Sequence, residues 1–274
     1  MCSTTGSRTR RMSCGCSASR RSPRCRRRDC VRAAPAAARE PREGSVRKLM
    51  PRSNKDAPTL QVDDVSPFME AYRTLKANIE FASRRRPIRA VAVASAVPGE
   101  GKSTTALYLA SAYARAGRTV VLVDGDIRKP TLHQVIDRRR SPGLTDYLLD
   151  PGMMPSYVLT DTMVGAAFIG AGRSVPNPSD LLASERMTEL IALLKQAYDM
   201  VIIDTPPILA AIDAKILAAK CDGVLLVLES GKAREKAVLK AKTELVQANA
   251  NLLGAVLNKM NRKALDPYSD YYGK

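Results

Sequence analysis

An α/β fold, with a mostly parallel sheet flanked by helices on both faces, is the fold class that this 274-residue chain predicts. Three observations predict it. Short apolar runs alternate with longer helix-like stretches, two of those runs end in aspartate, and a glycine-rich loop joins one run to the next helix. Strands buried on both faces of a parallel sheet read as continuous apolar runs.

The N-terminal segment, residues 1–49, differs in composition from the rest. It holds fourteen Lys and Arg and three Asp and Glu, so it carries +11 of the formal net charge of +17. With few large apolar residues it cannot bury a core. We interpret it as a disordered leader or a misassigned start, with Met50 as the alternative first residue, followed by a linker over 50–65. Binding of nucleic acid or acidic lipid through its arginines is the competing hypothesis.

Cysteine usage and hydropathy indicate a cytoplasmic protein. The body of the chain holds only Cys221, so it does not depend on disulfides. No run reaches the ~20 apolar residues that span a bilayer, and we expect contact with a membrane only through a partner. The other cysteines lack the spacing and the histidines of a metal site, and all lie in the leader: Cys2, Cys14, Cys16, Cys25 and Cys30.

The ordered domain is expected over residues 66–263, and it opens with an amphipathic helix. Ser66 supplies an N-cap and Pro67 suits the first turn. The apolar residues of this helix recur at helical spacing: Phe68, Tyr72, Leu75 and Ile79.

A phosphate-binding loop follows the strand predicted at 89–95 and precedes the helix predicted at 103–116. Backbone N–H groups and the positive end of the helix would surround a phosphate. Lys102 would reach the β- and γ-phosphates, and the Ser103 hydroxyl would sit on Mg²⁺. Ala96 occupies the usual first glycine position. The loop residues expected to contact the nucleotide are Pro98, Gly99, Glu100, Gly101, Lys102, Ser103 and Thr104.

Two strands end in carboxylates. The strand at 118–123 leads into Asp124 and Asp126, and the strand at 199–203 leads into Asp204. Since ligands bind at the carboxyl edge of open α/β sheets, these acids are expected beside the loop, where they would hold Mg²⁺.

The remaining elements keep the strand–helix alternation. Strands are predicted at 165–169, 223–229 and 252–258, and helices at 130–138, 143–149, 183–197, 208–219 and 233–248. The parallel crossovers should be right-handed.

The C-terminal segment, residues 264–274, predicts a flexible tail with a tyrosine cluster. Tyr268, Tyr271 and Tyr272 lie in the last seven residues and show no apolar periodicity. One interpretation is that the tail docks on its own domain. Since the chain also has a predicted nucleotide site, the more specific interpretation is that these tyrosines accept phosphate.

Taken together, these residues resemble the bacterial tyrosine autokinases of capsule and exopolysaccharide synthesis, the BY-kinases, over roughly residues 60–274. MinD- and ParA-like ATPases are the nearest alternative, but they typically carry Lys where this chain has Val97, and they lack a terminal tyrosine cluster. The segments that carry the resemblance are 66–79, 98–104, 124–130, Pro176–Leu182, 204–207 and the tyrosine tail.

The resemblance implies a P-loop NTPase fold of the deviant Walker type that uses ATP and Mg²⁺. Lys102 would neutralise the transferring phosphoryl group, and Asp124 would act as base or orient the incoming tyrosine. Ser103, Asp126 and Asp204 would form the metal shell. Asn258 is in the position that often reads adenine, while Arg128 and Lys129 would steady phosphates or an acidic acceptor.

The resemblance also implies partners. Glu70, Arg73 and Lys76 match an oligomerisation motif whose last member is usually Arg, and a ring would present the tail of one subunit to its neighbour. A transmembrane activator, or polysaccharide co-polymerase protein, and other protein substrates are expected, whereas specific nucleic acid is not. An ATPase switch without kinase activity and a nucleic-acid binder driven by the leader remain the alternative functions.

Overall fold

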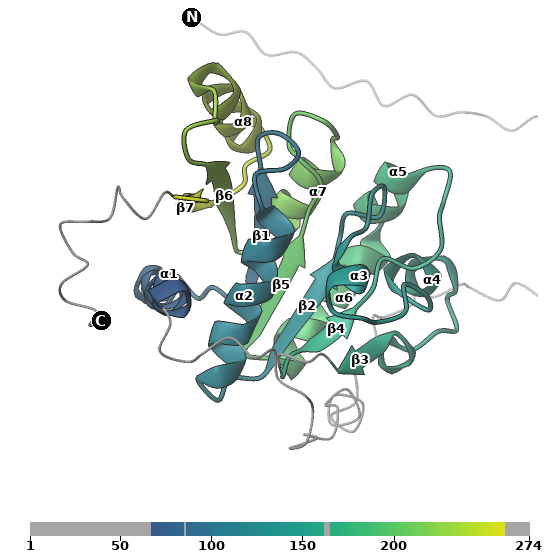
Figure 1. The fold of residues 1–274 in the computed structure, drawn as a ribbon. Helices are drawn as coiled ribbons and strands as arrows, with labels where there is room; N and C mark the ends of the chain where they lie inside the picture. The colour runs from purple at the N-terminus through teal and green to yellow at the C-terminus, as the bar shows by residue number, and fades with distance from the viewer. Residues whose placement is uncertain (1–66, 85, 162–164, 261–274) are drawn as a thin grey trace, which may run out of the picture. The chain divides into compact units, whose positions relative to one another are not determined.

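The computed structural model describes residues 67–84, 86–161 and 165–260. The predicted leader, the linker and the tyrosine cluster, Tyr268, Tyr271 and Tyr272, lie outside these residues. The described residues form a seven-stranded sheet with helices on both of its faces (Figure 1). The predicted fold class is therefore confirmed.

The strand order in the sheet is β3-β4-β2-β5-β1-β6-β7. All neighbouring strands pair in parallel except β3 and β4, which are antiparallel. The sequence did not predict β3, because its three residues, Leu-Thr-Asp, form no apolar run. The strands are β1 (Ala90–Ser95), β2 (Val120–Asp124), β3 (Leu159–Asp161), β4 (Ala167–Ile169), β5 (Met200–Asp204), β6 (Gly223–Glu229) and β7 (Leu252–Asn258).

The helices follow the predicted alternation, but several differ from their predicted bounds. A separate short helix precedes the one predicted at 183–197, and the helix predicted from residue 208 begins five residues later. The helix predicted at 130–138 covers only Leu132–Val135, and the 3₁₀ turn at Pro155–Tyr157 was not predicted. The helices are α1 (Pro67–Ser83), α2 (Lys102–Arg115), α3 (Leu132–Val135), α4 (Leu144–Leu149), the 3₁₀ turn η2 (Pro155–Tyr157), α5 (Pro178–Ala183), α6 (Glu185–Ala197), α7 (Asp213–Lys220) and α8 (Glu235–Gln247).

Both faces of the sheet are buried. In β2, Val120 and Leu122 pack into the core that α1 and α2 cover, whereas Val121 and Val123 pack into the core that α6 covers. A third apolar cluster joins α7 and α8 to β1 and β6. Every residue of β1, β2 and β5 is buried, so the central strands form a rigid support for the loops at their ends.

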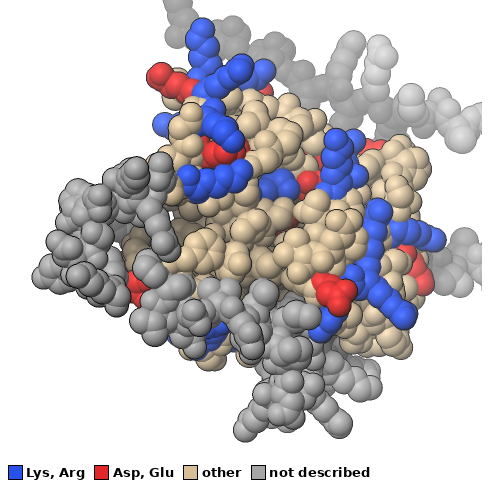
Figure 2. All heavy atoms as spheres, viewed as in Figure 1, with Lys and Arg blue, Asp and Glu red and all other residues tan. Residues whose placement is uncertain are grey.

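The surface carries a charged region over α8, where Lys and Arg side chains gather at the top of the view in Figure 2. Within the described ranges, no helix combines the length and the apolar character that crossing a membrane requires.

Candidate active site

The loops that follow β1, β2 and β5 meet at the carboxyl edge of the sheet, around a cavity of about 670 Å³. These strands are adjacent in the sheet, and each one either ends in a predicted site residue or leads into one. Residues predicted for nucleotide binding line the cavity together with residues that were not: Pro98, Gly99, Gly101, Lys102, Ser103, Thr104, Asp126, Arg128, Lys129, Thr131, Val135, Pro206, Pro207, Ala210, Ala211 and Lys259.

The glycine loop has the backbone of an anion cradle. Gly99 and Gly101 adopt φ values of 89° and 92°, in a region that favours glycine. A Cβ at Gly101 would lie 2.0 Å from Nδ2 of Asn258, so a side chain there would displace the Asn258 amide. Glu100 turns inward, and its Oε2 accepts a hydrogen bond from the Val97 N–H at 3.0 Å. Because α2 begins at Lys102, the free N–H groups of its first turn face the cavity.

Lys102 is the charge at the centre of the site. Its Nζ lies 3.1 Å from Asp126 Oδ2, 3.6 Å from Asp204 Oδ1 and 3.2 Å from the Ser103 hydroxyl. Burial alone would lower the pKa of Lys102, but the attraction of Asp204 and Asp126 outweighs it and the pKa is raised. The ammonium therefore stays charged at neutral pH.

Asp124 and Asp204 lie side by side, since they are register partners on β2 and β5. Both are fully buried, and none of their four carboxylate oxygens accepts a hydrogen bond from the residues described. Burial raises the pKa of Asp204 to about 6, with Lys102 limiting the rise. Burial and the charge of Asp204 raise the pKa of Asp124 well above its ordinary value.

These oxygens, which accept no hydrogen bond from the described residues, fit a hard divalent cation. Buried carboxylates without donors are costly, and a cation with oxygen preference satisfies them. Among the residues that the structure describes, no three His, Cys, Asp or Glu side chains converge as a complete protein cage. This suits Mg²⁺, which is commonly held by one or two carboxylates together with substrate phosphates and water. Ser103, Asp126 and Asp204 have the chemistry to hold it.

Arg128 is engaged away from the cavity centre. Its Nε and one terminal nitrogen bind the two oxygens of the buried Asp213 at 2.6 and 3.1 Å, and Ser179 donates to the same carboxylate at 2.6 Å. Arg128 therefore ties the loop after β2 to α7 and α5. The sequence prediction had Arg128 steadying phosphates or an acidic acceptor, and it did not identify Asp213 as the partner of Arg128.

The end of β7 supports the glycine loop. The Asn258 amide, predicted to read adenine, donates to the Glu100 carbonyl at 3.0 Å. The sequence prediction missed Lys259, whose Nζ donates to the Gly99 carbonyl at 2.7 Å and pairs with Glu229 at 3.0 Å. A non-glycine φ of 57° at Lys259 aims the side chain at the loop, and its position directly after Asn258 was the available signal.

The predicted oligomerisation residues on α1 differ in their partners and in their exposure. Glu70 and Arg73 form an exposed ion pair at 3.0 Å. Lys76 instead pairs with Glu80 at 3.0 Å and lies 5.5 Å from the centre of the Tyr113 ring, with only 17% of its side chain exposed. Of the three, Glu70 and Arg73 are the residues available on the outer surface.

Several known proteins resemble this chain in sequence and in fold. An AAA-domain family model matches residues 88–252. The tyrosine-protein kinase YwqD of Bacillus subtilis is 45% identical over 74% of this chain and 84% of its own length. Among solved structures, the kinase domain of Escherichia coli tyrosine kinase ETK matches with a TM-score of 0.70 and 31% identity, over 73% of this chain and 79% of that one. The chimerical protein CapA2B2 matches with a TM-score of 0.68 and 33% identity, over 75% and 94%.

Proposed function

This chain belongs to the family of bacterial tyrosine-protein kinases, and we propose that it transfers the γ-phosphate of ATP to tyrosines of its own C-terminal segment. The observation that carries the proposal is the position of Lys102, whose ammonium lies between Asp126 and Asp204 beside a glycine loop shaped for phosphate. Phosphoryl transfer depends mainly on positioning and charge stabilisation, so this set of groups is sufficient.

Different residues of the chain are proposed to have different roles in phosphoryl transfer. The N–H groups of the loop and of the first turn of α2 bind the phosphates of the nucleotide. Lys102 moves from its carboxylate partners to the phosphates and stabilises the charge that develops on the transferred group. Bound through Ser103, Asp126 and Asp204, Mg²⁺ would supply further charge neutralisation. Arg128, held on Asp213, fixes the loop that carries Asp126.

Asp124 is proposed as the group that orients or deprotonates the incoming tyrosine. It is fully buried and, unlike Asp126, does not line the cavity. Its role therefore requires that Lys102 leaves the carboxylates when phosphates bind. Its raised pKa fits a group that takes up a proton readily.

The acceptors proposed are Tyr268, Tyr271 and Tyr272, phosphorylated in trans within a homo-oligomeric ring. The exposed pair of Glu70 and Arg73 is available for subunit contacts. We further propose that a transmembrane protein activates the chain and recruits it to the inner face of the membrane. There the kinase would control polysaccharide synthesis and export. The match to the chimerical protein CapA2B2, whose name combines two components, supports a two-component arrangement.

Phosphosite mapping tests the function. The purified full chain is incubated with Mg·ATP and an activator segment, and phosphate is located by mass spectrometry. We expect label on the three tail tyrosines. Lys102→Met, which removes the ammonium but keeps the length of the side chain, should lower the transfer rate by about a hundredfold or more while the circular dichroism spectrum is unchanged.

Two outcomes would contradict the proposal. Unlabelled tail tyrosines in the presence of an activator would exclude autophosphorylation there. ATP turnover without phosphotyrosine, unchanged when residues 265–274 are deleted, would favour an ATPase switch instead.

A further inference from the structure

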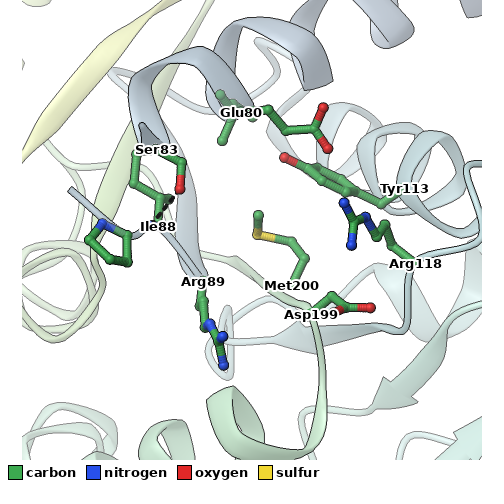
Figure 3. Close-up of a pocket in the computed structure, with 10 residues that line it drawn as sticks. Glu80, Ser83, Ile88, Arg89, Tyr113, Arg118, Asp199 and Met200 are labelled. Carbon is green, nitrogen blue, oxygen red and sulfur yellow. Dashed lines mark hydrogen bonds between the residues drawn. The ribbon is translucent and has the colours of Figure 1, made fainter. Parts of the chain in front are cut away.

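A second cavity lies at the opposite edge of the sheet, where β1, β2 and β5 begin. Its volume is about 340 Å³, and Figure 3 shows side chains from α1, α2 and the starts of β1 and β5 around it. The nucleotide cavity lies beyond the carboxyl ends of the same strands. The length of the sheet therefore separates this cavity, which we call the amino-edge cavity, from the phosphate-binding loop.

Tyr113 provides an unpartnered buried group in the wall of this cavity. The residue is only 2% exposed, and its hydroxyl makes no hydrogen bond to the residues described. In Figure 3 the polar ends of Tyr113, Glu80 and Arg118 gather on one side of the cavity. Burial and the nearby Glu80 raise the pKa of Tyr113, so the hydroxyl keeps a proton to donate. Buried polar groups without partners are rare in folded proteins, so this one calls for an acceptor.

The carboxylates at the cavity already have partners. Glu80 pairs with Lys76 at 3.0 Å, and Asp199 Oδ2 accepts hydrogen bonds from the N–H and the hydroxyl of Thr119, both at 2.9 Å. These contacts occupy both oxygens of Glu80 and one of the two oxygens of Asp199.

The arginine side chains at the cavity have unused hydrogen-bond donors. The Arg118 guanidinium is exposed and forms no hydrogen bond or ion pair with the described residues, although its charge helps to lower the pKa of Asp199. The guanidinium of Arg89 makes one hydrogen bond, to the Lys195 carbonyl at 3.3 Å. On the adjoining loop, Arg84 and Arg86 are exposed and add positive charge, which raises the local concentration of anions. The unused hydrogen-bonding capacity of the cavity is thus almost entirely that of donors.

We propose that the amino-edge cavity binds a small phosphate-bearing molecule, whose phosphate accepts hydrogen bonds from the Tyr113 hydroxyl and the Arg118 guanidinium. A guanidinium matches the geometry of phosphate oxygens. The organic part of the molecule would lie against Met200, Ile79 and Pro87, which supply apolar surface. The cavity volume is at the lower end of the range of small-molecule sites.

The methyl group of Met200 is a direct probe, because this side chain lines the amino-edge cavity. The full chain is labelled with ¹³C-methyl methionine, and Met200→Leu identifies the resonance. Glycerol 3-phosphate and inorganic phosphate are titrated separately, with saturating Mg·ADP present to fill the phosphate-binding loop. We expect the Met200 resonance to shift and to saturate.

Matched variants distinguish binding inside the cavity from the general attraction of anions to positive charge. Arg118→Gln should weaken binding by about tenfold or more, as for a lost charge-assisted hydrogen bond. Arg84→Gln is the control for long-range charge, because Arg84 lies 5.1 Å from the centre of the Phe81 ring and does not line the cavity; it should weaken binding far less than Arg118→Gln does. Tyr113→Phe should weaken binding without lowering the stability of the free chain.

Each result decides the proposal. A Met200 resonance that does not move, or equal losses in Arg118→Gln and Arg84→Gln, would overturn it. Lower stability of free Tyr113→Phe would also overturn it, since the hydroxyl would then have a structural partner. If vesicles that contain phosphatidic acid displace glycerol 3-phosphate in an Arg118-dependent way, the site is supported and its source of phosphate is a lipid headgroup.

Discussion

At the scale of single residues, Gly125 separates the two acids of the loop after β2 and leaves no room for a side chain. A Cβ there would lie 2.6 Å from the Asp204 carbonyl oxygen and 2.8 Å from Leu217 Cδ1. Gly125→Ala should therefore push β2 from β5, lower the free energy of unfolding by about 1–3 kcal/mol and weaken nucleotide binding. Urea denaturation and Mg·ADP titration measure both effects. Gly254→Ala is the control, since nothing lies within 4 Å of its Cβ position; equal effects in the two variants would contradict the crowding argument.

The pairing of Arg128 with Asp213 predicts that the stability losses of the single variants do not add up in the double variant. Arg128→Met leaves the fully buried Asp213 carboxylate with Ser179 as its remaining partner, and should cost about 1–3 kcal/mol of stability. Adding Asp213→Asn removes the buried charge, so the double variant should recover part of that loss. Chemical denaturation of the four proteins in the cycle measures the coupling. If the double variant is less stable than Arg128→Met by the full cost of Asp213→Asn alone, the two residues are not coupled.

At the scale of elements, Asp222 joins α6 to the starts of β1 and β6. Its Oδ1 accepts from Lys195 Nζ at 2.6 Å, and its Oδ2 accepts from the N–H groups of Arg89 and Ala90 at 2.9 Å each. Burial alone would raise the pKa of Asp222, but Lys195 and the two N–H groups outweigh it and the pKa is lowered.

A lowered folded-state pKa fixes the sign of the pH effect. The carboxylate stabilises the fold above its unfolded pKa of about 4, and this contribution is lost as pH falls through the lower folded pKa. Asp222→Asn should therefore cost about 1–2 kcal/mol at pH 7, and its difference from the parent should shrink below about pH 4. Denaturation midpoints between pH 3 and 7 test this. A difference that is constant over the whole range would show that the charge of Asp222 is not responsible.

The sequence predicted the strands that bear the site residues, but it did not predict the short elements and the long-range contacts that support them. Continuous apolar runs ending in aspartate identify β2 and β5, because both strands are buried on both faces. The three residues of β3 and the six of α5 are too short to show a period. Arg128 and Asp213 are 85 residues apart, and their contact depends on how α7 packs against α5 and β1, which local patterns do not encode. Backbone contacts from Asn258 and Lys259 to the glycine loop depend on the sheet order in the same way.

At the scale of the whole molecule, the two edges of one rigid sheet carry different chemistry. The carboxyl edge gathers acids around one lysine, which suits a nucleotide with its metal. The amino edge gathers unpaired donors around the hydroxyl of Tyr113. Since α1 contributes to the amino-edge cavity and also carries the exposed pair of Glu70 and Arg73, a ligand at that edge would contact the same helix that we propose for subunit contacts.

Transfer between subunits can be separated from transfer within one subunit by mixing two defective chains. Lys102→Met keeps the tail tyrosines but lacks the central ammonium, whereas a chain without residues 265–274 keeps the site but lacks the acceptors. If phosphate moves in trans, phosphotyrosine appears on the Lys102→Met chain only after mixing with the truncated chain and Mg·ATP. Intact-mass spectrometry distinguishes the two chains. Absence of label in the mixture, with label on the parent chain alone, would contradict transfer in trans.

Arg73→Ala then tests whether α1 brings the subunits together. The ion pair with Glu70 is exposed, and such pairs contribute about 0–1 kcal/mol to folding, so the melting temperature should hardly change. If α1 forms the contact, Arg73→Ala introduced into both chains of the mixture should lower the labelling rate and the mass measured by light scattering. Lys236→Ala on the exposed surface of α8 is the matched loss of one positive charge, and it should change neither quantity. A fall in labelling with unchanged mass would place Arg73 in acceptor binding instead of assembly.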